Sequence, residues 1–337
     1  MAQYILRRVV FAVFTLFGLS VIIFVMARVL PGDPARMAAG PRAPEWVVEQ
    51  IREQLNLDKP LHVQYFLWLR DVFNGDLGYS IFTKRSVTQD VIEYLPASLE
   101  LIAVAAVFQI LGAFALGVLA GMYAYRWVDN AIRLFAYIGI SIPAFGWAVI
   151  FQLVFAWKLD LFPVQGMLSV EAPERITGFV TIDSLITGRF DAFTDFLKHA
   201  VLPAMALAIG PMAQEARLIR SGMIDNRYKD YILLMESHGV PKRKLMFKYL
   251  LKPSAIPAVT VMGMDIASLL GNAFLVEIVF NWPGFSRYAI SVMLNKDLNA
   301  IVAVVMVIGV IFIIANIIVD IIAAYLDPRI RYVERGE

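Results

Sequence analysis

The sequence of 337 residues contains no cysteine and only three histidines. Without cysteine the chain can form no disulfide and offers no thiolate for catalysis or metal binding. The histidines, His62, His199 and His238, are too far apart in the sequence to predict a metal centre. The formal net charge of +2 argues neither for nor against a nucleic-acid partner.

Motifs for two kinds of enzyme are also missing. No G-x-x-x-x-G-K-[ST] phosphate loop occurs, so the chain cannot be a nucleotide-hydrolysing subunit of that type, and no G-x-S-x-G motif indicates a serine hydrolase. Two acids in apolar segments, Asp265 and Asp320, could in principle share a proton as in an aspartyl protease. Their flanking sequence does not support that chemistry, and acids in membrane segments more often mark pathways or partners. We therefore expect no catalysis by this chain.

Hydrophobic residues make up 59% of the chain, which is too apolar for a soluble domain. Long apolar runs instead predict an all-α membrane protein with six transmembrane helices. The first run is too long, and lacks a small-residue cleavage site, for a typical removed signal peptide, so we expect a retained anchor. The six runs are residues 9–27, 101–125, 134–157, 200–214 (extended to about 218), 255–280 and 300–319.

The distribution of basic residues predicts the orientation. Segment 217–256 contains nine Lys/Arg and three acids, and Arg7 and Arg8 precede the first run. The positive-inside rule therefore places this segment, the short turn at 126–131 and both termini in the cytoplasm. Segment 31–97 then lies outside, because a segment of this length translocates largely regardless of its charge.

We expect the external segment 31–97 to be mostly helical. One helix can open at Pro44, and a second can follow Asp58 as its capping residue. The second helix either packs on the membrane spans or contacts the substrate, and amphipathic faces more often serve packing. Four of its side chains fall on one side of the helix: Leu61, Tyr65, Leu69 and Val72.

Segment 217–256 is longer than a simple connection needs. Residues 228–238 predict a short helix, which Gly239 ends in a left-handed turn. Residues 242–251 predict a second, basic helix that two prolines close off, Pro253 and Pro257. Two readings remain open from the pattern alone: docking on a cytoplasmic protein, or a basic amphipathic helix lying on anionic lipid.

If this segment docks on a protein, its two stiff helices at a fixed angle would transmit movement to the fourth and fifth spans. Apolar contacts are expected from Tyr228, Tyr231, Leu234 and Met235. Charged contacts are expected around them from Arg227, Lys229, Lys242 and Arg243.

Polar groups inside the fifth run are candidates for a translocation path. Asp265 and Glu277 are about 18 Å apart along a continuous helix and on the same side of it, with Ser268 and Asn272 within about 60° of that side. Such acids face a bundle interior or a watery cavity, because lipid exposure is costly. The alternative for Glu277, which we prefer, is a helix-end residue bonded to the turn at 282–284.

Helix breakers and small residues complete the pattern. Pro143, Pro203 and Pro211 interrupt apolar runs, where they predict either moving kinks or static ones that improve packing. A row of glycines in the second run predicts close helix contact, within the chain or against another subunit: Gly112, Gly117 and Gly121.

Short motifs along nearly the whole chain resemble the permeases of the dipeptide/oligopeptide/nickel branch of ATP-binding-cassette (ABC) importers, in particular the dipeptide permease B type. Their order and spacing together carry the resemblance. The matching motifs are Arg7-Arg8, Leu30-Pro31-Gly32-Asp33-Pro34, Leu57-Asp58-Lys59-Pro60, Gln64-Tyr65, Gly75-Asp76-Leu77-Gly78, Leu95-Pro96-Ala97-Ser98-Leu99-Glu100, Ser141-Ile142-Pro143, Leu202-Pro203-Ala204, Arg217 with Arg220, Val276-Glu277, Trp282-Pro283-Gly284 and Asp327-Pro328-Arg329.

Segment 217–256 resembles the conserved loop of importer permeases, whose consensus is Glu-Ala-Ala, three residues and Gly. Gly239 occupies the glycine position. The Glu-Ala-Ala positions here hold Leu233-Leu234-Met235, and the nearest glutamate, Glu236, comes three places late. The resemblance thus favours docking on an ATPase, while this departure weakens the assignment of single residues.

The resemblance implies the permease subunit of a type I ABC importer in a bacterial inner membrane, carrying di- or oligopeptides or related small polar solutes. It implies a second permease, two cytoplasmic ATPases that bind ATP and Mg²⁺, and an external solute-binding protein, with no cofactor on this chain and no nucleic-acid partner. The expected divisions are a tail and first span (1–30), an external segment (31–97), a core of five spans (98–326) and a cytoplasmic tail (327–337). The alternatives are a self-contained secondary transporter or channel, and a membrane-anchored scaffold.

Overall fold

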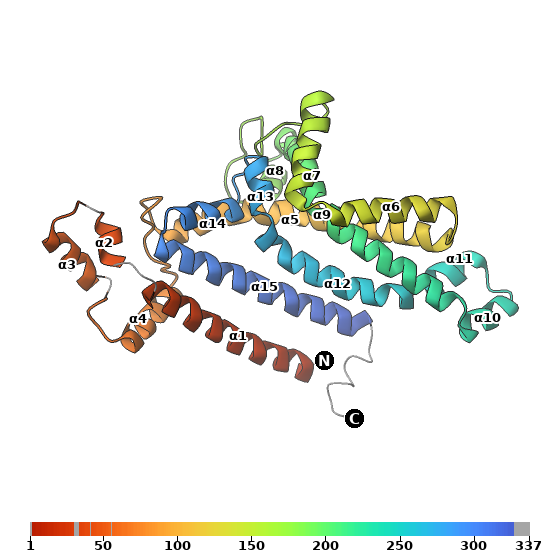
Figure 1. Cartoon of the computed structure of the whole chain (residues 1–337), viewed down its shortest axis with the longest axis horizontal. Coiled ribbons are helices and arrows are strands. Elements are labelled where there is room, and N and C mark those ends of the chain that lie inside the picture. Colours follow the sequence, from red (N-terminus) through yellow and green to blue (C-terminus); the bar gives the residue numbers. More distant parts are fainter. Residues whose placement is uncertain (1, 30–33, 41, 55, 327–337) are drawn as a thin grey trace. The chain divides into compact units, whose positions relative to one another are not determined.

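The computed structural model describes residues 2–29, 34–40, 42–54 and 56–326. These residues form helices and connecting loops, and within them the only β pairing is an isolated bridge between Tyr79 and Ser86 (Figure 1). The expected tail 327–337 and part of the opening motif, residues 30–33, lie outside the described residues.

The chain divides into two compact units. One consists of Leu6–Leu95 and Tyr288–Ile311, and the other of Met1–Ile5, Pro96–Arg287 and Phe312–Glu337. Four helices therefore contribute to both units: α1 (Ala2–Val29), of which only the first residues belong to the second unit, α5 (Val87–Met122), α14 (Phe285–Leu294) and α15 (Leu298–Leu326).

The first unit contains α1 (Ala2–Val29), α2 (Pro34–Ala39), α3 (Glu45–Gln54) and α4 (Leu61–Phe73), with the start of α5, most of α14 and the first half of α15. Helix α4 packs on α1. The Tyr65 ring meets the Phe24 ring edge to face at 5.3 Å between centroids, and its hydroxyl shares a 2.7 Å hydrogen bond with the Ser20 hydroxyl. The predicted helical segment after α1 is confirmed, and α4 serves packing.

The predicted apolar side of α4 was partly wrong. Leu61 is half exposed, whereas Gln64 and Tyr65 are the buried side chains, because the contact with α1 selects the face. Asp58 does not cap the helix, since Pro60 occupies the cap position and no side chain bonds to the first turn.

The second unit contains the rest of α5 and the run from α6 to α13. Its helices are α6 (Trp127–Ser141), α7 (Ala144–Phe151), the π-helix η1 (Gln152–Lys158), α8 (Val180–Ile186), α9 (Phe190–Arg227), α10 (Asp230–Ser237), α11 (Lys242–Lys244), the π-helix η2 (Leu245–Leu250), α12 (Leu251–Asn272) and α13 (Phe274–Val279).

Helix α9 lies at the centre of this unit. Its Met212, Ile219 and Met223 are buried and fill the space over Gly112, Gly117 and Gly121 of α5. At Gly117 a methyl group would lie only 2.7 Å from the Ile219 Cβ. The predicted glycine contact therefore exists and is made inside the chain.

Among the residues that the structure describes, five helices are long and apolar enough to cross a membrane, or six if the bent pair α6 and α7–η1 counts as one span. The predicted span 134–157 falls on this pair, and the kink expected at Pro143 is a bend of 106° between two separate helices. Proline lacks the N–H that would continue α6 and forces the preceding residue out of the helical region, and Ile142 is extended at φ −96°, ψ 124°. By contrast, α9 continues through both Pro203 and Pro211.

Candidate functional site

The turn between α9 and α12 forms the first candidate site (Figure 1). Helix α10 ends where Gly239 takes a left-handed conformation, φ +72°. The Gly239 N–H donates to the Glu236 carbonyl at 3.0 Å, and the Val240 N–H donates to the Met235 carbonyl at 3.1 Å. These bonds satisfy carbonyls that the end of a helix leaves open, and the predicted glycine turn is confirmed.

The predicted length of this segment needs correction. Helix α9 continues to Arg227, and α11, η2 and α12 follow one another without a break, so that only residues 228–241 lie outside the two long helices. Pro253 and Pro257 lie inside α12 and do not close off a separate helix. The π-helical turn η2 ends at Leu250, three residues before Pro253.

The surface of this turn combines apolar and basic side chains. Helix α10 buries Ile232 and leaves Leu234 59% exposed, and Tyr228 beside it is 70% exposed. Tyr231 is close to one-third exposed, and Met235 is half-buried. The four predicted cations are all exposed: Arg227, Lys229, Lys242 and Arg243. Next to them, Phe247 and four neighbours form an open groove of about 560 Å³. We name residues 228–248 the α10 turn.

The α10 turn is held by a close approach of α9 and α12. Gly222 of α9 faces the backbone of Ser254, where a methyl group would lie 2.5 Å from the Ser254 carbonyl oxygen. One turn later, the Asn226 amide donates to the Gly222 carbonyl at 2.8 Å and to the Ser254 hydroxyl at 3.1 Å. These contacts join the end of α9 to the start of α12 directly beside the turn.

The second candidate site lies among the acids of α9 and α12. Asp265 is half-buried, and its Oδ2 atom has no hydrogen-bond partner among the described residues. Ser268 donates to the Asp265 backbone carbonyl at 2.8 Å, and Asn272 reaches the Ser268 hydroxyl at 3.5 Å. These three residues share one side of α12, as the spacing predicted.

The structure separates Glu277 from this group. Helix α12 ends at Asn272, and Glu277 lies in α13, fully buried. Its carboxylate accepts hydrogen bonds from the Ser98 hydroxyl and from the Arg287 N–H, the latter at 2.7 Å, and it packs against Gly284. Glu277 therefore anchors the turn that follows α13, in line with the preferred alternative, and the expectation of one continuous helical face is wrong.

A further acid, Glu215 of α9, was missed from the sequence. It is fully buried, accepts a 2.5 Å hydrogen bond from the Gln109 amide of α5, and interacts electrostatically with Asp265. The uncharged run behind the predicted fourth span ended at Gln214, and its extension to about residue 218 rested on length alone, so Glu215 was not singled out as an intramembrane acid. Glu215 Oε2 and Gln109 Oε1 have no partner within the described ranges. Two carboxylates and one amide from three helices thus meet inside the bundle.

An ion pair ties α9 to the start of α6. The Arg220 guanidinium donates to both oxygens of the fully buried Asp129, at 2.5 and 2.7 Å. The Tyr125 N–H adds a third hydrogen bond to this carboxylate at 2.8 Å. A two-pronged contact of this kind fixes the angle between helices as well as their distance.

Comparison with known proteins agrees with this architecture. The family model described as "Binding-protein-dependent transport system inner membrane component" matches residues 113–332, and the model of the matching N-terminal region matches residues 1–102. The chain belongs to this permease family. It is an all-α, multi-pass inner-membrane transport component of the type I ABC class, it works with other subunits, and it is not an enzyme.

Several curated relatives match the permease over almost its whole length. It is 37% identical to the probable D,D-dipeptide transport system permease protein of Escherichia coli (strain K12), over 93% of each chain. It is 33% identical to the dipeptide transport system permease protein of Alkalihalophilus pseudofirmus, over 98% of this chain and 100% of the relative. The glutathione transport system permease protein of Salmonella typhimurium is 32% identical, over 98% and 100%.

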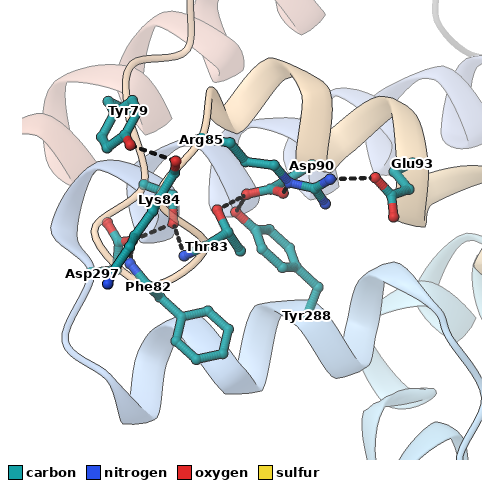
Figure 2. A network of polar contacts seen from close by, with 10 residues as sticks. Tyr79, Phe82, Thr83, Lys84, Arg85, Asp90, Glu93, Tyr288 and Asp297 are labelled. Carbon is teal, nitrogen blue, oxygen red and sulfur yellow. Dashed lines mark hydrogen bonds and ion pairs between the residues drawn. The ribbon is translucent and has the colours of Figure 1, made fainter.

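In the first unit of the permease, the loop before α5 is held by a polar network (Figure 2). Asp90, fully buried, accepts hydrogen bonds from Arg85, from the Thr83 hydroxyl at 2.6 Å and from the Tyr288 hydroxyl at 3.0 Å. Burial and the hydrogen bond to Asp90 raise the pKa of Tyr288, so its hydroxyl stays protonated and acts as the donor. The network joins the loop to α14.

A second buried carboxylate holds the other side of the same loop. Asp297, between α14 and α15, accepts hydrogen bonds from the Ser80 hydroxyl at 2.6 Å and from the Phe82 N–H at 3.0 Å. Figure 2 shows these contacts beside those of Asp90. Ser80 lies two residues after the Gly75-Asp76-Leu77-Gly78 motif, and its hydrogen bond to Asp297 fixes this loop.

Proposed function

We propose that this permease is the transmembrane subunit of an ATP-driven importer for di- or oligopeptides or related small polar solutes. The relatives named above are permeases of D,D-dipeptide, dipeptide and glutathione transport systems, and all three solutes are short peptides or peptide-like. Their common chemistry supports a peptide-sized solute with free charged ends for this chain.

We propose four partners: a second permease, two cytoplasmic ABC ATPases that bind ATP and Mg²⁺, and an external solute-binding protein. The permease itself holds no cofactor. Both termini and the α10 turn face the cytoplasm, and residues 31–97 lie outside. The Lys/Arg asymmetry of the sequence supports this orientation.

The observation that carries the proposal is the exposed α10 turn at the joint end of α9 and α12. Apolar side chains such as Leu234 are left in solvent there, beside basic ones. A partner with an apolar groove and an acidic rim would bury them. Closure of two ATPases would then move α9 and α12 through the Gly222–Ser254 contact.

The decisive experiment compares two glycine variants in proteoliposomes that contain the purified complex. Gly239→Leu places a side chain at φ +72°, where an L-residue is strained by roughly 1–2 kcal/mol. We expect uptake per ATP hydrolysed to fall while the chain stays inserted. Gly188→Leu is the matched control, because Gly188 also has φ +72° and open space around it but lies before α9.

Three outcomes would contradict the proposal. Equal coupling in both glycine variants would make Gly239 a turn residue only. Uptake that needs an ion gradient and no ATP would favour a self-contained secondary transporter. Labelling of Ser237→Cys by an impermeant thiol reagent added outside intact cells would overturn the orientation, and the absence of natural cysteine makes that label specific.

We also propose that Asp265, with Ser268, Asn272 and Glu215, borders the translocation path and attracts a cationic group of the solute. The unpartnered Asp265 carboxylate oxygen supports this role. Asp265→Asn should lower uptake of cationic dipeptides more than that of neutral ones. Asp225→Asn, at an exposed position of α9, is the control. Equal loss for both solutes would make Asp265 a structural residue.

A further inference from the structure

The first unit of the permease contains a cavity of about 210 Å³ that the transport pathway does not explain. Its walls come from the end of α1, from α4, from the turn after α4 and from the start of α15. Pockets for drug-sized ligands measure ~300–1,000 Å³, so this cavity suits only a small molecule. Two motifs of the family resemblance reach it, with Gln64 of one and Asp76 and Gly78 of the other in its lining.

One wall of the cavity carries a cation without a counter-charge. Arg28, in the last turn of α1, is half-buried, and its guanidinium lies over the Phe24 ring at 5.5 Å from the centroid. Among the described residues no carboxylate pairs with Arg28. A guanidinium has five N–H donors, and stacking on a ring satisfies none of them. The cavity therefore presents unused donors and a positive charge.

Another wall carries an acceptor without a donor. Gln64 is 7% exposed, and its amide nitrogen donates to the Lys59 carbonyl at 2.7 Å. That bond fixes the amide, so the oxygen is the free end, and Gln64 Oε1 is buried without a hydrogen-bond partner. A buried acceptor that stays unpaired destabilises the folded state, because the hydrogen bond it made to water is not replaced. A ligand that donates an N–H to this oxygen would remove that cost.

Negative charges complete the lining. The Asp71 side chain of α4 is 44% exposed, and within the described part of the chain its carboxylate pairs with the exposed Arg70, at 3.3 Å. Asp76 uses its Oδ1 atom to accept the Gly78 N–H at 2.8 Å, which leaves Oδ2 available. The cavity thus has one unpaired cation, one unpaired buried acceptor and two carboxylates within a small volume.

We propose that this cavity binds a small zwitterion, whose anionic group contacts Arg28 and whose ammonium group contacts Gln64 Oε1 and the neighbouring carboxylates. A purely anionic ligand would leave the acceptors unpaired, and a purely cationic one would leave Arg28 unpaired. A free dipeptide and the phosphatidylethanolamine headgroup both carry this pair of charges. The placement of the cavity on the outer side of the membrane rests on the proposed function, whereas its binding chemistry does not.

Trp68 lines the cavity and provides a local probe. The purified complex is placed in phosphatidylglycerol nanodiscs without nucleotide, and tryptophan emission is followed during titration with L-alanyl-L-alanine. We expect a saturable change that is lost in Trp68→Phe. N-acetyl-L-alanyl-L-alanine, with only the anion, and L-alanyl-L-alanine amide, with only the cation, should bind about tenfold more weakly or worse, since each loses a charged hydrogen bond.

Variants test the same contacts from the protein side. Arg28→Gln and Gln64→Leu should each weaken binding about tenfold or more, whereas Arg42→Gln, at an exposed position of the same external segment, should not change it. The ligand analogues are tested on the unaltered protein, so the proposal stays falsifiable even if a variant fails to fold.

A second arm identifies the source of the zwitterion. If the lipid headgroup is the ligand, Trp68 emission differs between phosphatidylethanolamine and phosphatidylglycerol nanodiscs, the difference disappears in Arg28→Gln, and the dipeptide competes poorly. Either source supports a zwitterion site. No response to dipeptide or lipid, or equal binding of the singly charged analogues, overturns it. Because no ATP or transport is involved, failure here is distinct from failure of ATP-driven uptake.

Discussion

The close contact between Gly222 and Ser254 gives a sharp prediction for Gly222→Ala. The added methyl group would lie 2.5 Å from the Ser254 carbonyl oxygen and 3.0 Å from its Cα atom. Ordinary C···O contacts begin near ~3.3 Å, so α9 and α12 must separate by roughly 0.8 Å at this point. Both atoms belong to the backbone, so no side-chain rotation can relieve the clash.

The expected cost follows from two opposing terms. Overpacking of a tight contact typically costs ~1–3 kcal/mol. Alanine in place of glycine inside a helix returns about 0.5–1 kcal/mol. The net expectation is a destabilisation of about 1–2 kcal/mol. We also expect Gly222→Ala to lower the coupling of uptake to ATP hydrolysis, because the displaced contact lies where the α10 turn joins the two long helices.

The matched control is Gly271→Ala in α12, where no atom lies within 4 Å of the added methyl group. This variant receives the helix-propensity gain without the clash and should be slightly more stable than the original chain. Stability is measured as the temperature at which the purified complex loses its monodisperse gel-filtration peak, and coupling as solute imported per ATP hydrolysed. If Gly222→Ala matches Gly271→Ala in both measurements, this contact does not hold α9 and α12 together. The proposal that it transmits movement of the α10 turn to the two helices would then be wrong.

Two further predictions concern buried charged contacts. Glu277→Ala removes the acceptor of the Ser98 hydroxyl and should destabilise the purified complex by about 2–4 kcal/mol in thermal unfolding. Glu277→Gln keeps an acceptor and should cost less. Equal losses of stability in the two variants would show that the hydrogen bonds contribute little. Arg220→Ala leaves the buried Asp129 unpaired and should cost about 3–5 kcal/mol, and Arg220→Lys, which keeps the charge without the fork, should lie between it and the original chain. Full recovery by lysine would mean that geometry does not matter there.

The number and type of membrane helices could be predicted from the sequence because long apolar runs depend on local composition. The course of the third run could not. The sequence located Pro143 as a breaker, but a kink and a 106° bend share the same local pattern. The angle depends on how α6 and α7 each pack on α9. Gly139 of α6 lies close to Ala213 of α9, so that a methyl group added to Gly139 would lie 3.3 Å from the Ala213 Cβ. That contact is not visible along the chain.

The α10 turn shows the same division between local and distant information. The left-handed turn at Gly239 was predictable, since it needs only a helix end and a residue without a side chain. The boundaries on either side were not. Polar composition placed residues 217–227 in the connecting segment and made residues 242–251 a separate basic helix, but both stretches continue the long helices. A helix that leaves the membrane keeps its backbone bonds and changes only its side chains, so composition alone places such an end too early.

The buried acids show why a search by uncharged runs misses the residues of most interest. A rule that accepts only apolar residues ends a span at the first acid, and here it stopped one residue before Glu215, the acid that interacts with Asp265. The useful signal is an acid followed by further helix-forming residues, because a membrane helix can carry a charge only if a neighbouring helix supplies its partner. Gln109 of α5 supplies that partner from more than a hundred residues away. An acid at the edge of a predicted span is therefore better treated as part of the span, with its partner sought on the other helices.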